Sequence, residues 1–205
     1  MLPVEKLLDE HRLISQCLEL IPTANRMMKS AVPLPSDFFQ QLIAFSREFI
    51  HRYHHFKEEY HLFPLVARKA QGPFRLHLAF LRNQHEQGQQ CIDEIEMDLG
   101  AHSPGHTNGR RALQQHLAAF HALLSEHIRK EDEFFPLIGD TLTQEDLISL
   151  EAEFALVDDI TGPEFLTRNR ERVRYLSILL SSARQHLAPP KELLLPADQQ
   201  QGARR

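Results

Sequence analysis

The chain has no tryptophan, only two cysteines and only 8 glycines among its 205 residues. Two cysteines cannot build the disulfide framework of a small secreted protein, and few glycines favour helices over turn-rich sheet. No apolar run approaches the about 20 residues that cross a bilayer, and the N-terminus lacks the basic and apolar regions of a signal peptide. We therefore expect a cytoplasmic, helical protein that does not engage the membrane.

Acidic residues outnumber basic ones and give a formal net charge of -5. A chain with this balance lacks the concentrated basic surface that nucleic acid binding needs, so nucleic acid is not an expected partner. The hydrophobic share of 42% and the charged share of 25% are ordinary for a globular protein. Histidine is the exception, because it occurs 13 times and needs a chemical explanation.

Apolar residues recur at helical spacing along most of the chain, while prolines and glycine-containing turns divide the pattern. Pro22 and Pro64 are expected to bend or end their helices, and Pro136 is expected to close the fourth. Four long helices with short connections predict an all-α, up-down-up-down four-helix bundle. The expected helices cover residues 4–29, 36–64, 73–99 and 110–135 of the bundle, followed by 143–159 and 164–187.

These helices suggest three parts of the chain. Residues 1–140 would form the bundle, residues 141–187 additional C-terminal helices packed on it, and residues 188–205 a disordered tail. The C-terminal helices carry an apolar stretch at 175–180 and would dock a partner or form a homodimer with a second copy of the chain.

One motif occurs twice, in residues 55–64 (HFKEEYHLFP) and 127–136 (HIRKEDEFFP). Each copy reads histidine, three residues, glutamate, and then a Phe-Pro whose proline lies five positions past the glutamate. Each also has a second histidine upstream, since His11 precedes His55 by 44 residues and His85 precedes His127 by 42. The bundle therefore resembles two copies of one helix pair.

The spacing within the motif suits a metal site. Residues four apart lie on one face of an α-helix, so each histidine and its glutamate can point together into the bundle. Imidazole and carboxylate together are a ligand set that iron accepts, and a carboxylate can bridge two cations. In both motif copies the proline lies five positions past the glutamate, and this position selects one histidine and one glutamate in each of the two helices that carry the motif. The candidate metal ligands are thus His11, His55, Glu59, His85, His127 and Glu131.

The doubled motif, together with Asp9-Glu10-His11 and Asn83-Gln84-His85-Glu86, resembles the hemerythrin-like HHE cation-binding proteins over residues 4 to 140. The pattern is most similar to the di-iron members with four histidines and two glutamates, which include iron–sulfur-cluster repair proteins and iron-sensing domains. The resemblance implies two iron ions in an oxo- or hydroxo-bridged di-iron centre, with the two glutamates as bridges. It also implies binding of, or reaction with, a small diatomic or peroxide (O2, NO, hydrogen peroxide) in stress response or iron handling.

Several alternatives remain open at this point. Asp132 competes with Glu131, because oxygen-carrying hemerythrins use a His-x4-Asp spacing on the fourth helix. His51 is a further ligand, a hydrogen-bond partner of one, or simply a partly buried histidine. His54 and Glu58 repeat the motif spacing one residue earlier, and we expect them on a solvated face.

The departures from the family pattern bear on function. Oxygen carriers have two histidines a turn apart on the third helix, but here the positions four either side of His85 are Leu81 and Gln89, which argues against reversible oxygen carriage. The repair proteins carry an extra N-terminal domain with a cysteine pair, whereas this sequence starts with the bundle. A second class of function, suggested by the apolar stretch at 175–180, is an iron or redox sensor whose C-terminal helices engage a partner. Iron storage is less favoured, because ferritin-like sites use Glu-x-x-His.

Overall fold

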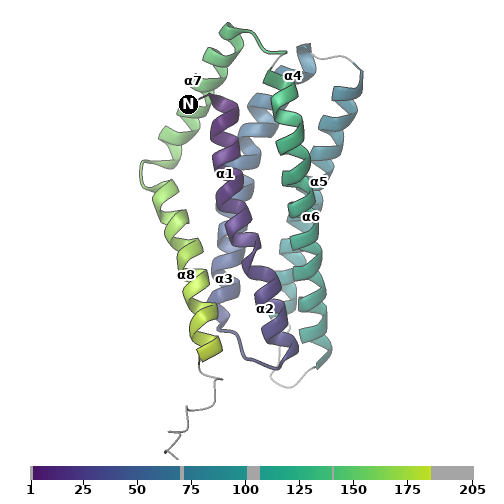
Figure 1. The fold of residues 1–205 in the computed structure, drawn as a ribbon, viewed down its shortest axis with the longest axis vertical. Helices are drawn as coiled ribbons and strands as arrows, with labels where there is room; N and C mark the ends of the chain where they lie inside the picture. The colour runs from purple at the N-terminus through teal and green to yellow at the C-terminus, as the bar shows by residue number, and fades with distance from the viewer. Residues whose placement is uncertain (1, 70–71, 101–106, 140, 186–205) are drawn as a thin grey trace, which may run out of the picture.

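The computed structural model describes residues 2–69, 72–100, 107–139 and 141–185, and within these ranges the chain is helical with no strand. Long helices run antiparallel along the vertical axis of Figure 1, and a further helix pair lies against one side of them. The expected all-α bundle with additional C-terminal helices is confirmed. Every described helix is too short or too polar to cross a lipid bilayer. The expected tail at 188–205 lies outside the described residues.

The first bundle helix is divided into α1 (Pro3–Leu18) and α2 (Leu20–Lys29), with a break at Glu19. Pro22 explains the break. A proline inside a helix removes one backbone donor, and its ring collides with the carbonyl four residues earlier, here that of Leu18. The chain therefore bends at this point and continues within the bundle, which is one of the two effects expected of Pro22.

The second bundle helix contains the feature that most affects the site. It begins as α3 (Ser36–Phe45), continues as two π-helical segments, η1 (Ser46–His55) and η2 (Glu58–Leu62), and ends as α4 (Phe63–Lys69). A π-helix pairs residue i with i+5, so each turn holds more residues than an α-helical turn, and such turns are concentrated at functional sites. Pro64 does not end the helix but lies in the first turn of α4.

The third and fourth bundle helices are α5 (Pro73–Gly100) and α6 (Thr107–Gly139). The prediction that Pro136 closes the fourth helix is wrong, because α6 continues past it by three residues. A proline costs one hydrogen bond inside a helix, and tertiary packing can outweigh that loss. Phe134, Phe135 and Ile138 supply such packing, since all three are nearly fully buried around the proline.

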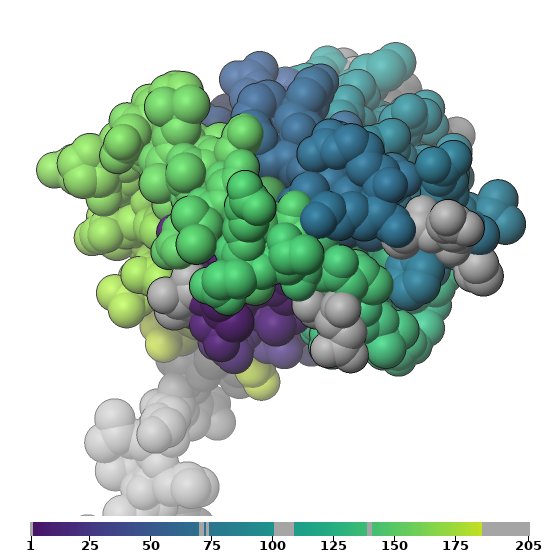
Figure 2. Space-filling model, turned by 90° about the horizontal axis from the view of Figure 1, so that it is seen from above, coloured from purple at the N-terminus to yellow at the C-terminus, as the bar shows by residue number. Residues whose placement is uncertain are grey.

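Two further helices, α7 (Gln144–Thr161) and α8 (Phe165–Gln185), extend the fold beyond the bundle. Thr143 caps α7, because its hydroxyl accepts from the backbone N–H of Asp146 while the Asp146 carboxylate accepts from the Thr143 backbone. Gly162 ends the helix with a φ of 87°, a conformation that favours glycine. Figure 2 looks onto the end of the molecule where α7 lies between α1 and the η2–α4 segment.

The buried apolar residues form two clusters, one centred on the α2, α3 and α8 end and the other on the α4 and α7 end. Each bundle helix passes from one cluster to the other through buried polar residues. On α5, for example, His85 lies between Leu81 of one cluster and Ile92 of the other. The bundle thus encloses a polar layer between two apolar layers.

Candidate metal centre

The polar layer contains most of the residues that the sequence selects. His11 comes from α1, His55 from η1, His85 from α5, and His127 and Glu131 from α6, and each is at most 3% exposed. Four helices that are far apart in sequence therefore direct these side chains to one place. Burial of five titratable groups in a bundle core is costly unless they are paired or bind metal.

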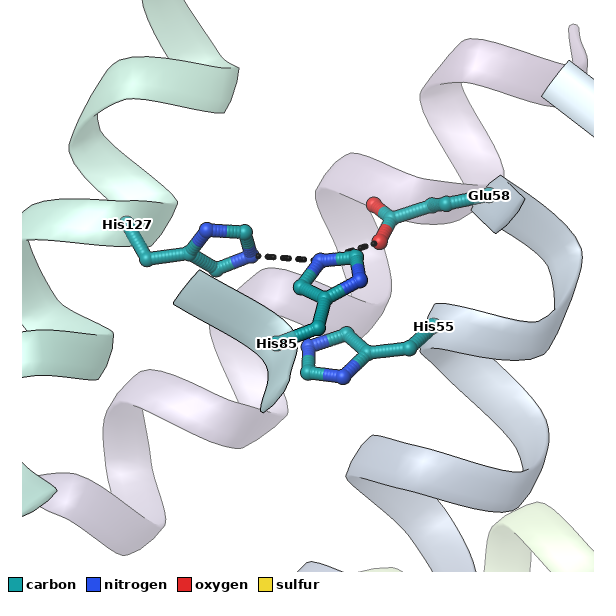
Figure 3. A group of neighbouring side chains, drawn as sticks. All are labelled: His55, Glu58, His85 and His127. Carbon is teal, nitrogen blue, oxygen red and sulfur yellow. Dashed lines mark hydrogen bonds and ion pairs between the residues drawn. The ribbon is translucent and has the colours of Figure 1, made fainter. Parts of the chain in front are cut away.

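Two groups of donor atoms form in this layer, each with its atoms within 4.8 Å of one another. The first combines three histidines with one glutamate, and Figure 3 shows His85 at its centre with its ring stacked on that of His55. The second combines two histidines with two glutamates. The members are His55, Glu58, His85 and His127 in the first group, and His11, His54, Glu58 and Glu131 in the second.

Glu58 belongs to both groups. Its Oε1 lies 3.4 Å from Nε2 of His54, and its Oε2 lies 3.4 Å from Nε2 of His85. The two oxygens of one carboxylate therefore face different sets of imidazoles. This is the arrangement that a carboxylate bridge between two cations requires.

Glu131 also connects the groups. Its Oε2 lies 3.2 Å from Nε2 of His11 and 3.1 Å from Nε2 of His127, and its Oε1 lies 3.8 Å from Nε2 of His85. Two carboxylates thus stand between the two sets of histidines.

The donor atoms fit a metal ion better than they fit each other. Both oxygens of Glu58, both oxygens of Glu131, and Nε2 of His11 and of His54 are buried without a hydrogen bond to any protein group. A buried polar atom without a partner costs about 1–3 kcal/mol, so six in one place need a common partner. Converging imidazole nitrogens and carboxylate oxygens are ligands of iron and related divalent metals.

Each histidine of the two groups also forms a hydrogen bond through its outer ring nitrogen, the Nδ1 atom that faces away from the other donor atoms. Metal-binding histidines usually donate the N–H of their other ring nitrogen to an acceptor, which fixes the tautomer and the ring orientation. All five histidines follow this rule through Nδ1. The partners are Asp132 at 2.7 Å from His11, Glu10 at 2.9 Å from His54, His51 at 3.3 Å from His55, Glu59 at 2.5 Å from His85, and Gln84 at 3.4 Å from His127.

A comparison with protein-family models matches the hemerythrin HHE cation binding domain to residues 2–138. The chain belongs to the hemerythrin HHE family. The match covers the bundle, including all residues of both donor groups, and ends before α7 and α8. Searches among curated proteins and among solved structures found no significant match.

Within this hemerythrin domain the structure does not bring Glu59 into either donor group. Its carboxylate is 31% exposed and accepts from Nδ1 of His85 instead. The expectation that His54 and Glu58 lie on a solvated face is wrong, because they are 1% and 0% exposed. The α-helical spacing fits both pairs equally, and the wider π-helical turns of η1 and η2 decide which side chains point inward.

The structure also places the two residues that the sequence left open. Asp132 lies outside both groups and hydrogen bonds the outer nitrogen of His11, whereas Glu131 is in the second group. His51 likewise lies outside both groups. Burial and the neighbouring His85 lower the pKa of His51 to about 4, so its imidazole is neutral at pH 7.

Charge within the site follows from the carboxylates. Burial lowers the pKa of His11, but the neighbouring carboxylates of Asp132 and Glu131 outweigh burial and leave that pKa well above its ordinary value. Burial also lowers the pKa of His85, but the neighbouring carboxylates of Glu131 and Glu59 outweigh burial and raise that pKa to about 9. The pKa of His55 lies well below its ordinary value because of burial and of His85. A metal ion would therefore displace protons from His11 and His85 on binding.

A buried charged network connects the site to the C-terminal helices. Glu10, which accepts from His54, also accepts from Nζ of Lys57 at 2.8 Å. Lys57 is 0% exposed, lies over the ring of Tyr53, and reaches Oδ1 of Asp158 on α7 at 2.9 Å. Glu10 and Lys57 lie within sequence motifs, but no motif predicts their contact with each other or with Asp158, because it depends on packing between distant helices.

Proposed function

We propose that this hemerythrin-family chain is a non-haem di-iron protein that binds or reacts with O2, NO or peroxide. The observation that carries the proposal is Glu58, whose two unpartnered carboxylate oxygens face separate sets of histidines. Two donor groups that share carboxylates suit two metal ions. The proposed ligands are His11, His54, His55, Glu58, His85, His127 and Glu131.

The choice of iron rests on the donor types. Neither donor group contains cysteine, and imidazole with carboxylate is the combination found in iron oxygenases with open coordination positions. Iron bound here would supply Fe(II)/Fe(III) redox cycling and free coordination positions for a small ligand. Closed four-ligand zinc sites usually contain cysteine, so a structural zinc site is less favoured.

The two groups contain four residues each but unequal numbers of histidines. Three imidazoles lie in the first group and two in the second, with Glu58 and Glu131 between them. When both carboxylates are shared, the side with two histidines leaves more room for an exogenous ligand, so we assign ligand binding to the His11 and His54 side. His11 stacks on the buried ring of Phe135, which helps to exclude water from that side.

The structure removes one argument against oxygen binding. Of the two histidines on the third helix, His77 and His85, only His85 joins a donor group, but His55 of the second helix joins His85 and His127 in the first group. The shortage of histidines on α5 therefore does not exclude O2 as a ligand.

The test is the metal content and visible spectrum of the full chain, expressed with iron and handled without oxygen. We expect about two irons per chain and an absorption band that changes on exposure to air, NO or peroxide. A chain that holds one zinc, or holds iron whose spectrum responds to none of these, would contradict the proposal.

A second function, a sensor that signals through its C-terminal helices, is supported by the network from His54 through Glu10 and Lys57 to Asp158. A change at His54 would reach α7 through three direct contacts. Limited proteolysis with and without iron tests this function. We expect cleavage within residues 141–185 to increase on iron removal, and an identical digestion pattern in the two states would count against a sensor.

Asp158→Asn should weaken the link between the site and α7. This variant should therefore show the fast digestion pattern even when it is iron-loaded. Asp159→Asn is the matched control, because Asp159 is the next residue on the same helix and is exposed. Equal digestion of the two variants would show that the contact of Asp158 does not couple α7 to the site.

A further inference from the structure

A cavity of about 400 Å³ lies beside the candidate metal centre, between the η1–η2 segment and α5, with α6 as its floor. A water molecule occupies about 30 Å³ in the liquid, so the space far exceeds what a diatomic needs. Cavities of about 300–1,000 Å³ are typical of small-molecule sites. Neither the metal site nor the proposed reaction accounts for a space of this size.

The cavity adjoins the candidate metal centre on the side where the Nδ1 atoms of His55 and His85 lie. It is lined by His55 and His85, and also by His51 and Glu59, which are the partners of their Nδ1 atoms. The inner Nε2 of His85 faces Glu58 and His127 instead. The cavity is therefore behind two candidate ligands, and a molecule within it would contact their hydrogen-bond partners.

His51, which lines the cavity, has a ring nitrogen without a hydrogen-bond partner. Its Nδ1 lies 3.3 Å from Nδ1 of His55 and 3.2 Å from Nε2 of Gln89, both of which can donate to it. An accepting Nδ1 leaves the proton of the neutral ring on Nε2. That Nε2 is buried and has no hydrogen-bond partner. An acceptor oxygen on a bound molecule would satisfy it.

The rest of the lining favours a neutral molecule with an apolar body. Four buried apolar side chains form part of the wall, contributed by η1, α5 and α6. The charged lining residues balance, with two arginines against two carboxylates. The apolar residues are Ile50, Ile92, Phe120 and Leu124, and the charged ones are Arg47, Arg52, Glu59 and Asp93.

We propose that this cavity binds a small neutral organic molecule with an apolar body and one acceptor oxygen, such as an alcohol or a phenol, hydrogen-bonded to Nε2 of His51. The site uses residues outside both donor groups apart from the outer sides of His55 and His85. It therefore does not depend on which metal the centre holds.

Phenol is the probe, and binding to the full chain as purified is measured by calorimetry and by backbone amide shifts in NMR. We expect saturable binding, with the largest shifts near Gly88 and Gln89, which line the cavity. Benzoate has a similar ring but a negative charge, and we expect it to bind at least tenfold more weakly. Tighter binding of benzoate, or no saturable binding of phenol, would overturn the proposal.

Two matched substitutions localise the probe. Leu124→Phe fills the cavity from α6 and should weaken phenol binding at least tenfold. Leu117→Phe adds the same volume two turns earlier on α6, at a residue that is equally buried but does not line the cavity, and should leave binding unchanged. Should Leu124→Phe fail to fold, Ile92→Phe fills the same space from α5. Equal binding by the filled and control variants would exclude the cavity.

Two further measurements distinguish the cavity from the metal centre. His51→Phe removes the donor and keeps a ring, and should weaken phenol binding about three- to tenfold, as expected for one hydrogen bond. Chelation of any bound metal should leave phenol binding intact. Binding that disappears on chelation while the helical signal persists would place the probe on the metal and refute the cavity site.

Discussion

Nζ of Lys57 lies 2.8 Å from Oε1 of Glu10, and both side chains are buried between α1 and the second bundle helix. Buried charges of this kind lose most of their hydration, so each depends on its partner. Since Glu10 also accepts from His54, this pair supports the candidate centre as well as the fold. Its removal should therefore be visible in both stability and metal binding.

Glu10→Gln should lower the free energy of unfolding by about 3–5 kcal/mol, because it leaves Lys57 buried with only Asp158 as its carboxylate partner. Urea unfolding monitored by circular dichroism measures the change. Asp9→Asn is the control, since Asp9 is the adjacent residue and pairs with Arg12 at the surface, where such pairs contribute less than about 1 kcal/mol. A similar loss for both variants would show that the buried pair has no special role.

Glu58→Gln should reduce the metal content of both donor groups, because one carboxylate faces both. Glu59→Gln should leave the number of bound ions unchanged and weaken affinity by about 10–100-fold, as is usual when a partner of a metal-binding histidine is altered. Metal analysis after equilibrium dialysis at several free metal concentrations separates the two outcomes. If Glu59→Gln lost the ions and Glu58→Gln kept them, the original assignment from the sequence would be correct.

His54→Gln should bring the metal content from about two ions per chain to one, since it removes one of only two histidines in the second group. His61→Gln is a suitable control, because His61 follows η1 on the same helix but pairs with Glu153 on α7, outside both groups. Metal analysis with circular dichroism as a check of folding measures both. Two ions retained by His54→Gln would exclude His54 as a ligand.

The capping box of α7 should make the docking of that helix pH-dependent. Hydrogen bonds with Lys69 and Thr143 lower the pKa of Asp146 to about 2. A carboxylate whose pKa is depressed in the folded state stabilises that state above its unfolded pKa, and this contribution disappears as the pH falls through the folded value. The stability advantage of the wild type over Asp146→Asn should thus be complete above about pH 4 and shrink toward about pH 2. Urea midpoints of the two proteins across this range measure it, and a constant difference would contradict the assignment.

The sequence predicted the bundle because apolar periodicity, prolines and glycines act locally, and five of its six candidate ligands lie in the two donor groups. His127 and Glu131 lie four apart in α6, where the spacing argument holds. It failed in the second helix, where His54–Glu58 and His55–Glu59 share one spacing and only the π-helical turns distinguish them. The register of the second motif copy could not resolve this choice, because that copy lies in an α-helix.

The contacts of the C-terminal helices could not be predicted from local sequence patterns, for a different reason. Lys57 and Asp158 are 101 positions apart, and although Lys57 lies within the repeated motif, Asp158 lies outside it and nothing in the motif points to their contact. Burial of Lys57 depends on Tyr53, Glu10 and α7 arriving together. Interactions of this kind follow from the packed structure and have no counterpart in sequence spacing.

The π-helical segments make the length of the second helix as important as its composition. Arg52 is exposed on η1. Replacing it would leave the buried layer unchanged, but deleting it would move His54, His55 and Glu58 back by one position relative to α3. Because a wide turn accommodates one more residue than an α-helical turn, the shortened segment could revert to regular α-helix without exposing apolar residues of α3. Single-residue insertions and deletions in this short stretch are therefore a route by which a protein of this family could lose its metal centre and keep its fold.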